Sequence, residues 1–204
     1  MTVFVDSKPV QFASLAASGV TDRAQAEQLS KLNGFTSATL YSVTHRVAFV
    51  TQLNDAPKNF TKVFSPGTPP PPGVLADLRL WLFLCVVDGH GSLVAGRALS
   101  VDITEALRVT RMLAALKAQP ADVRLAASVE LYGIARTIIS TPWFRACGSA
   151  PVSAYELRKF NREMDEWETY WRPELLHAAE VGDIFAMTVI DTFSSLVRLI
   201  VNAS

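Results

Sequence analysis

The sequence has few of the residues that build covalent frameworks or broad charged faces. It contains two cysteines among 204 residues, Cys85 and Cys147, too few for a disulfide framework and without the spacing of a metal site. Its 19 basic and 19 acidic residues cancel, which argues against a broad basic face of the kind that binds nucleic acid unaided. Cys85 lies in an apolar run, so we predict a small buried thiol in a reducing compartment.

The familiar catalytic motifs are absent as well. No Walker loop, dinucleotide fingerprint, HExxH, CxxC or GxSxG pattern occurs. One set of residues offers a nucleophile and a base, Cys147 with His90 or His177 and Asp88, but a chain of this length offers such a set by chance. We therefore predict that the protein is not an enzyme and uses no cofactor or metal.

Long uninterrupted apolar segments are missing too. The most apolar stretch, 184–201, contains Asp191 and Arg198, which makes it a poor membrane span. The first residues lack the basic and apolar regions of a secretory signal. We expect no membrane partner.

Apolar residues at helical spacing occupy most of the chain, whose length suits a single domain over 1–204. The predicted helices are two within 9–53, a buried one over 74–87, one after Asp102, a long one from Asp122 to about Ile139, one over 155–170, and an apolar one within 174–204.

Prolines and glycines predict the breaks between these helices. Segment 54–73 ends in four consecutive prolines, so we expect an irregular loop in which Phe60 to Phe64 form at most a short edge strand. Two glycines flank His90 within 88–92, which favours a turn over the alternative of a phosphate or metal loop. Pro173 is predicted to interrupt the last helical region.

Charged residues follow the same helices. Asp102 with Glu105 three residues later resembles a capping box at a helix start. Glu105, Arg108 and Arg111 then share one face, which is typical of a solvated row of ion pairs and also compatible with a groove for a nucleic-acid backbone. Arg124 is expected on the outside of the next helix.

The segment 143–171 is the richest in aromatic residues, and apart from Cys147 no candidate for a nucleophile with its base or for a metal site accompanies them. We interpret it as a device for packing and contact, which indicates assembly in preference to catalysis. The apolar helix within 174–204 has apolar residues on several sides, so it either threads a bundle core or docks on a neighbouring subunit, and we favour docking. The packing and contact residues are Tyr155, Arg158, Phe160 and Trp167.

Three passages resemble the coat proteins of rigid rod-shaped plant viruses of the tobacco mosaic virus type. The order of a proline and Gln-Phe before the first helix, an arginine in the second helix, and a late series of glycine, aromatic and basic residues is similar to that family. The chain departs from the family in its greater length, its altered Arg-Lys-Phe spacing and its apolar C-terminal helix. The residues that carry the likeness are 9–16, 43–46, Gly148, Ser149, Tyr155, Arg158, Phe160 and Trp167.

The resemblance implies an all-α fold: an antiparallel four-helix bundle with extra terminal helices and a small β-sheet. It also implies a coat protein that polymerises helically on single-stranded genomic RNA through arginine–phosphate contacts, found in the virion and the host cytoplasm. Intersubunit carboxylates that repel one another when ionised would be Asp88, Asp102 and Glu105. The RNA-binding residues that it implies are Arg46, Asp88, Arg97, Arg108, Arg111 and Arg124.

A second interpretation belongs to a different class of function. The chain could be a helical scaffold or adaptor that binds another protein through its C-terminal apolar helix. Such a protein forms a finite oligomer and is indifferent to RNA, whereas a coat protein forms rods that protect RNA.

Overall fold

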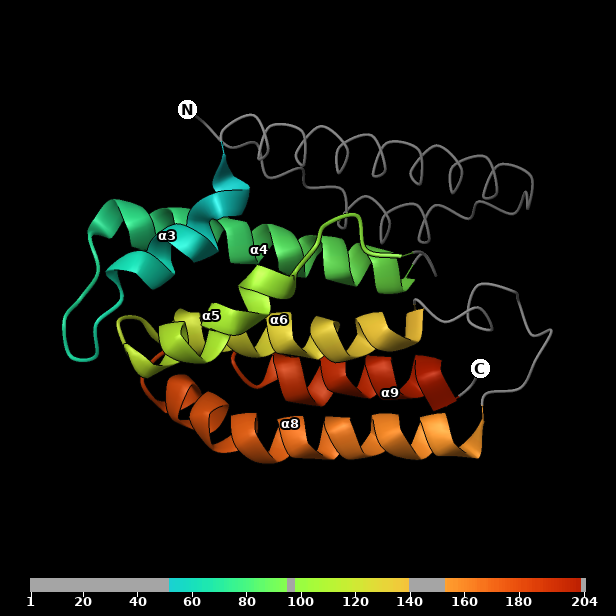
Figure 1. Ribbon diagram of the computed structural model, residues 1–204. Helices are drawn as coiled ribbons and strands as arrows, with labels where there is room; N and C mark the ends of the chain where they lie inside the picture. The colour runs from blue at the N-terminus through green and yellow to red at the C-terminus, as the bar shows by residue number, and fades with distance from the viewer. Residues whose placement is uncertain (1–51, 95–97, 140–152, 203–204) are drawn as a thin grey trace, which may run out of the picture. The chain divides into compact units, whose positions relative to one another are not determined.

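The computed structural model describes residues 52–94, 98–139 and 153–202, which form helices joined by short connections (Figure 1). All of them belong to the larger of two compact units, His45–Ser204. The smaller unit, Met1–Thr44, lies outside the described residues. The expected single domain, and the helices expected within 9–53, therefore stay predictions.

The described part of the chain is all-α, as predicted. It holds six α-helices and no strand; an isolated bridge pairs Ser65 with Thr68. The elements, in chain order, are the short turn η1 (Leu53–Asp55), α3 (Ala56–Val63), α4 (Pro72–Val94), α5 (Thr104–Ala115), α6 (Pro120–Ile139), α8 (Ala154–Glu180), the π-helix η2 (Val189–Ser194) and α9 (Ser195–Asn202).

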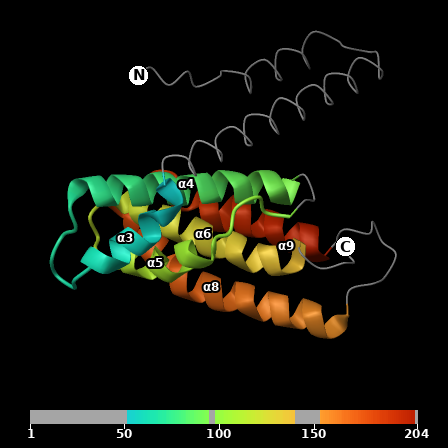
Figure 2. The same ribbon diagram turned by 45° about the horizontal axis from the view of Figure 1, so that its top comes forward.

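Helix α6 is the centre of this arrangement. It packs against α4 and α5 on one side and against α8 and η2 on the other, as Figure 2 shows for α4, α6 and α8. Its Val129 lies in the apolar core shared with α3, α4 and α5, and its Tyr132 lies in the core shared with α8, η2 and α9. Because both cores cover it, α6 is apolar on nearly every side.

The turn predicted at 88–92 is wrong, because α4 continues through it to Val94. Gly89 is there for a different reason: a Cβ at this position would lie 2.5 Å from Cγ of Tyr132 on α6. The glycine thus allows the two helices to approach closely. Burial of Leu82 and Leu93 on either side stabilises the helix across these residues.

The irregular segment is also shorter than predicted. Helix α3 occupies 56–63, so the edge strand expected from Phe60 is wrong. Pro57 stands in the first turn of α3, where a missing N–H leaves no bond unmade. Phe60 is fully buried on the core side of this helix, which leaves only 64–71 without helical structure.

The predicted capping box at Asp102 is wrong as well. Helix α5 begins at Thr104, one residue later than a cap at Asp102 requires, and its cap residue makes no side-chain hydrogen bond. The Asp102 carboxylate instead accepts from the backbone N–H and the hydroxyl of Thr104, at 3.0 and 2.6 Å. The capping box of the described chain is formed by Ser153 and Glu156, at the start of α8.

Helix α8 continues through Pro173, contrary to the predicted interruption. A proline inside a helix costs about 3 kcal/mol, but burial of two large side chains offsets such a cost. Trp171 and Leu175, on either side of the proline, are both fully buried. The helix ends at Glu180, so the predicted continuous helix within 174–204 is in fact the end of α8, a turn, η2 and α9.

Candidate interaction surfaces

The turn that follows α8 is built by a glycine. Gly182 has a φ of +119°, a backbone conformation that residues with a side chain rarely adopt. This conformation allows the chain to turn after α8. The N–H of Asp183 then donates to the carbonyl of Ala178 at 2.9 Å, which satisfies an acceptor at the helix end. The chain therefore leaves α8 in a defined direction.

A buried carboxylate fixes this turn to α6. Asp183 is 8 % exposed, and its carboxylate accepts from Nε of Arg124 at 2.8 Å and from the backbone N–H of Phe185 at 3.2 Å. A charge-assisted bond of this length is among the stronger hydrogen bonds in proteins. The residues beside Asp183 are thus held against the bundle by a residue 59 positions earlier in the chain.

Large apolar side chains at the end of α8 and in the turn after it are exposed to solvent. Ile184 is 80 % exposed and Phe185 is 61 % exposed, while Val181 and Leu176 are about half exposed. We call these four residues the 176–185 patch. These four exposed apolar residues lie within ten positions of the chain, and a group of this kind is a better candidate for an interaction site than a single exposed residue is. The C-terminal segment also threads the core, because Ala186, Val189, Ile190 and Val197 are buried.

The arginines predicted to bind RNA differ in the carboxylate with which each one pairs. Arg124 is bound by Asp183, Arg111 is bound by Glu130, and Arg108, whose side chain is 70 % exposed, pairs with Glu105 on the same helix. Each described candidate is therefore neutralised by a carboxylate of its own chain. Arg46 and Arg97 lie outside the described residues.

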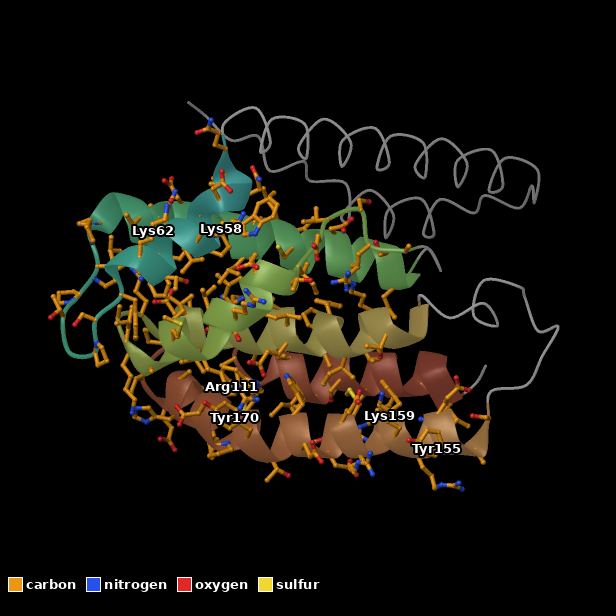
Figure 3. The ribbon with its side chains drawn as sticks, viewed as in Figure 1. Lys58, Lys62, Arg111, Tyr155, Lys159 and Tyr170 are labelled. Carbon is orange, nitrogen blue, oxygen red and sulfur yellow. The ribbon has the colours of Figure 1, made fainter. Side chains whose placement is uncertain are left out.

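Glu130 collects four hydrogen bonds at the junction of three helices. Its carboxylate accepts from the Thr110 hydroxyl at 2.7 Å, from Nε and Nη2 of Arg111 at 3.1 and 3.3 Å, and from the Trp171 indole at 2.9 Å. The hydrogen bond to Glu130 raises the pKa of Arg111. Arg111 also lies 4.2 Å from the ring centre of Tyr170 (Figure 3). An acid in the middle of an apolar helix was the sequence signal for this node, and its partners could not be identified without the fold.

The three carboxylates proposed for contacts between subunits are occupied within the chain. Asp88 is fully buried and accepts from the backbone N–H groups of Ser100 and Val101 at 2.7 and 3.1 Å. This burial argues against both predicted roles of Asp88, as an RNA contact and as a carboxylate that faces another subunit. Asp102 bonds Thr104 and Arg136, and Glu105 bonds Arg108.

The predicted aromatic and basic cluster separates into two parts. Phe160 and Trp167 are core residues, each 3 % exposed, and the Trp167 indole donates to the carbonyl of Ala127 at 3.1 Å. Tyr155 is 68 % exposed, and Arg158 is exposed and pairs with no carboxylate among the described residues. Gly148 and Ser149 lie outside the described residues. The buried and the exposed members of the predicted cluster thus lie on different sides of α8, and the contact role of the exposed ones stays a prediction.

The exposed side of α8 carries charges of opposite sign in succession. Within 158–166 the lysine and arginines come first and the acids follow, whereas Glu156 precedes this run and Arg172 follows it. Figure 3 shows Lys159 in the first half of the helix and Tyr170 farther along. A shallow hollow of about 640 Å³ lies over the second half, lined by Arg162, Asp165, Glu166, Thr169, Tyr170 and Glu174. We call the following residues the outer face of α8: Tyr155, Arg158, Lys159, Arg162, Asp165, Glu166, Thr169 and Tyr170.

The described members of the chance catalytic set lie on two helices, Asp88 and His90 on α4 and His177 on α8. His90 lies 3.1 Å from the Tyr132 hydroxyl and packs on Phe193, while His177 is on the far part of α8 beside Glu180. Cys85 is buried as predicted, and burial raises the pKa of its thiol. Cys147 lies outside the described residues. Among those described, no group of three His, Cys, Asp or Glu side chains could hold a metal ion.

Comparison with known proteins finds no relative of this chain. No protein-family model, no curated protein and no solved structure matches it. Within the described residues, no helix is long and apolar enough to cross a membrane.

Proposed function

We propose that the protein is a structural coat protein whose subunits pack against one another along single-stranded RNA, with the four-helix bundle of that family as its frame. The observation that carries the proposal is the 176–185 patch, which presents large apolar side chains to solvent on a turn anchored by Arg124. The resemblance of the chain to rod-forming coat proteins is the reason for proposing single-stranded RNA as the partner and the virion and the host cytoplasm as the location.

The patch is large enough to matter energetically. Burying a Phe or Ile side chain contributes about 1.5–3 kcal/mol, so Ile184 and Phe185, at 80 % and 61 % exposed, would contribute roughly 3 kcal/mol together. That amount corresponds to more than a hundredfold in affinity. Since the turn is already ordered by Asp183, little of this gain is lost in fixing the backbone.

The ion pairs rank the described arginines as RNA contacts. Arg108 is the best candidate, because its partner Glu105 is partly exposed and regains water when the arginine turns to a phosphate. Arg111 is the poorest, because its departure would leave Glu130, 14 % exposed, without its charged donor. Arg124 is similarly tied to the buried Asp183.

A helical scaffold or adaptor is the second candidate. It is favoured by the same neutralisation, since Arg111 and Arg124 already have carboxylate partners and the formal net charge of the chain is zero. In this case the 176–185 patch receives a different protein, and assembly stops at a finite oligomer.

Negative-stain electron microscopy of the full chain, with and without single-stranded RNA at low and high salt, separates the two. We expect rods or filaments whose RNA resists nuclease, with protection that weakens as salt rises. Uniform small particles that ignore RNA would reject the coat protein and favour the scaffold.

Two variants test the patch itself. Ile184→Ser with Phe185→Ser should reduce assembly on the order of a hundredfold, measured as the protein concentration at which particles appear. Val63→Ser, on α3, is the matched control, because it removes another exposed apolar side chain away from the patch. Equal assembly by the patch variant and the control would remove the observation on which the proposal rests.

A further inference from the structure

We propose that the outer face of α8 is a contact between two copies of this chain, with α8 of one copy antiparallel to α8 of the other. The inference rests on the proposed self-assembly and adds a second surface to it, distinct from the 176–185 patch. It is carried by the order of charges along one exposed helix face.

That face is divided into a basic half and an acidic half. Arg158, Lys159 and Arg162 come first, and Asp165 and Glu166 follow within one turn of the last of them. The side chains of Arg162, Asp165 and Glu166 are 68 %, 69 % and 72 % exposed, so the charges are available to a partner. When two copies of this helix lie antiparallel, the basic half of each copy therefore faces the acidic half of the other.

A two-fold axis crossing α8 between Arg162 and Asp165 shows this complementarity. It places Arg162 of one copy opposite Asp165 and Glu166 of the other, and the symmetry repeats each contact. The same register brings Arg158 near Tyr170, which is 41 % exposed although Arg111 of its own chain already lies over its ring. The hollow of about 640 Å³ beside Tyr170 leaves room for the incoming side chains.

Two of these charges already pair within one copy: Lys159 lies 3.8 Å from Glu163, and Asp165, although 69 % exposed, accepts from Arg198 at 2.7 Å. The others have weak partners or none among the described residues. Arg162 and Glu166 are 4.0 Å apart, the limit of an ion pair, and both are more than two-thirds exposed. An exposed pair of this kind contributes little to stability, so exchanging it for a contact with another copy costs little. Arg158 pairs with no carboxylate among the described residues.

A second copy fits this face better than a nucleic acid does. A phosphate backbone drawn to Arg158 and Arg162 would meet Asp165 and Glu166 within about 12 Å along the helix axis, since each residue rises about 1.5 Å. Like charges at that range repel at low salt. A partner with a uniform charge is therefore disfavoured, and an antiparallel copy is matched in both halves.

Charge reversal in RNA-free full-length protein tests the inference by sedimentation velocity at low and high salt. Arg162→Glu and Glu166→Arg should each weaken self-association on the order of tenfold at low salt, because each places like charges at positions 162 and 166 opposite one another across the axis. An equimolar mixture of the two variants should regain it, because an acidic face then meets a basic one. Lys62→Glu, on α3, is the matched control and should leave it unchanged (Figure 3).

The mixture distinguishes a lost contact from a folding defect, because two misfolded variants would not regain association when they are mixed. A mixture that associates no better than either variant alone overturns the inference, and so does a wild-type protein that stays monomeric at low salt. If filaments form on RNA but Arg162→Glu is without effect, only the α8 contact fails. If the patch variant assembles normally, the proposed function loses its support independently.

Discussion

Replacing Gly89 by alanine tests the close contact between α4 and α6. An added Cβ would lie 2.5 Å from Cγ and 2.8 Å from Cβ of Tyr132. The Cβ of Tyr132 is fixed to the α6 backbone, so a change of rotamer cannot relieve the overlap. The two helices must move apart, and both apolar cores contain residues of α4 and α6.

The expected loss follows from two opposing terms. Alanine gains about 1 kcal/mol of helix propensity over glycine. Overpacking in a core costs about 1–3 kcal/mol, and displacing Tyr132 weakens its hydrogen bond to His90, a contact of about 1 kcal/mol. Gly89→Ala should therefore lower the free energy of unfolding by roughly 1–3 kcal/mol.

Gly73→Ala, at the start of the same helix, is the matched control. Nothing lies within 4 Å of a Cβ at that position, so the change should be neutral or stabilising by up to about 1 kcal/mol. Urea denaturation followed by far-ultraviolet circular dichroism measures both values. If Gly89→Ala is as stable as the wild type, then α4 does not approach α6 as described. The turn predicted from the sequence at 88–92 would then be the better interpretation.

Two further substitutions test buried and exposed charges by the same unfolding measurement. Asp122, whose side chain is 2 % exposed, accepts from Nε and Nη2 of Arg79 at 2.7 and 2.8 Å, so Asp122→Asn should cost about 2–3 kcal/mol, and an unchanged midpoint would show that the pair is solvated. Hydrogen bonds from Thr104 lower the pKa of Asp102, so its stabilisation is present above the ordinary carboxyl pKa and lost as pH falls through the lowered one. Asp102→Asn should therefore narrow the difference in stability between neutral and acidic pH, and a pH profile that matches the wild type would contradict this.

The sequence predicted those elements whose signals are local. The helix expected over 122–139 is α6, because Pro120 and Asp122 suit a helix start and apolar residues recur at the helical period. The buried position of Cys85 also followed from its neighbours. In both cases the residues that decide the structure lie within a few positions of one another.

The predictions from the sequence were wrong where the local structure depends on residues that are far apart in the chain. Gly89 was interpreted as a turn residue because its partner, Tyr132, stands 43 positions later on another helix. Pro173 was interpreted as a break because the burial of Trp171 depends on the carboxylate of Glu130 and the core around it. The node at Glu130 was missed entirely, since all four of its hydrogen bonds come from other helices.

Salt distinguishes the three surfaces that bear on the proposed assembly. Contacts of Arg108 with phosphate release counterions, so RNA protection should fall steeply as salt rises. The α8 contact joins exposed opposite charges and should weaken with salt even without RNA. The 176–185 patch is apolar, and its association should persist at high salt or strengthen in sulfate, which is excluded from protein surfaces. A polymer held chiefly by Ile184 and Phe185 would then survive high salt after its RNA became accessible to nuclease, whereas one held chiefly by α8 would dissociate first.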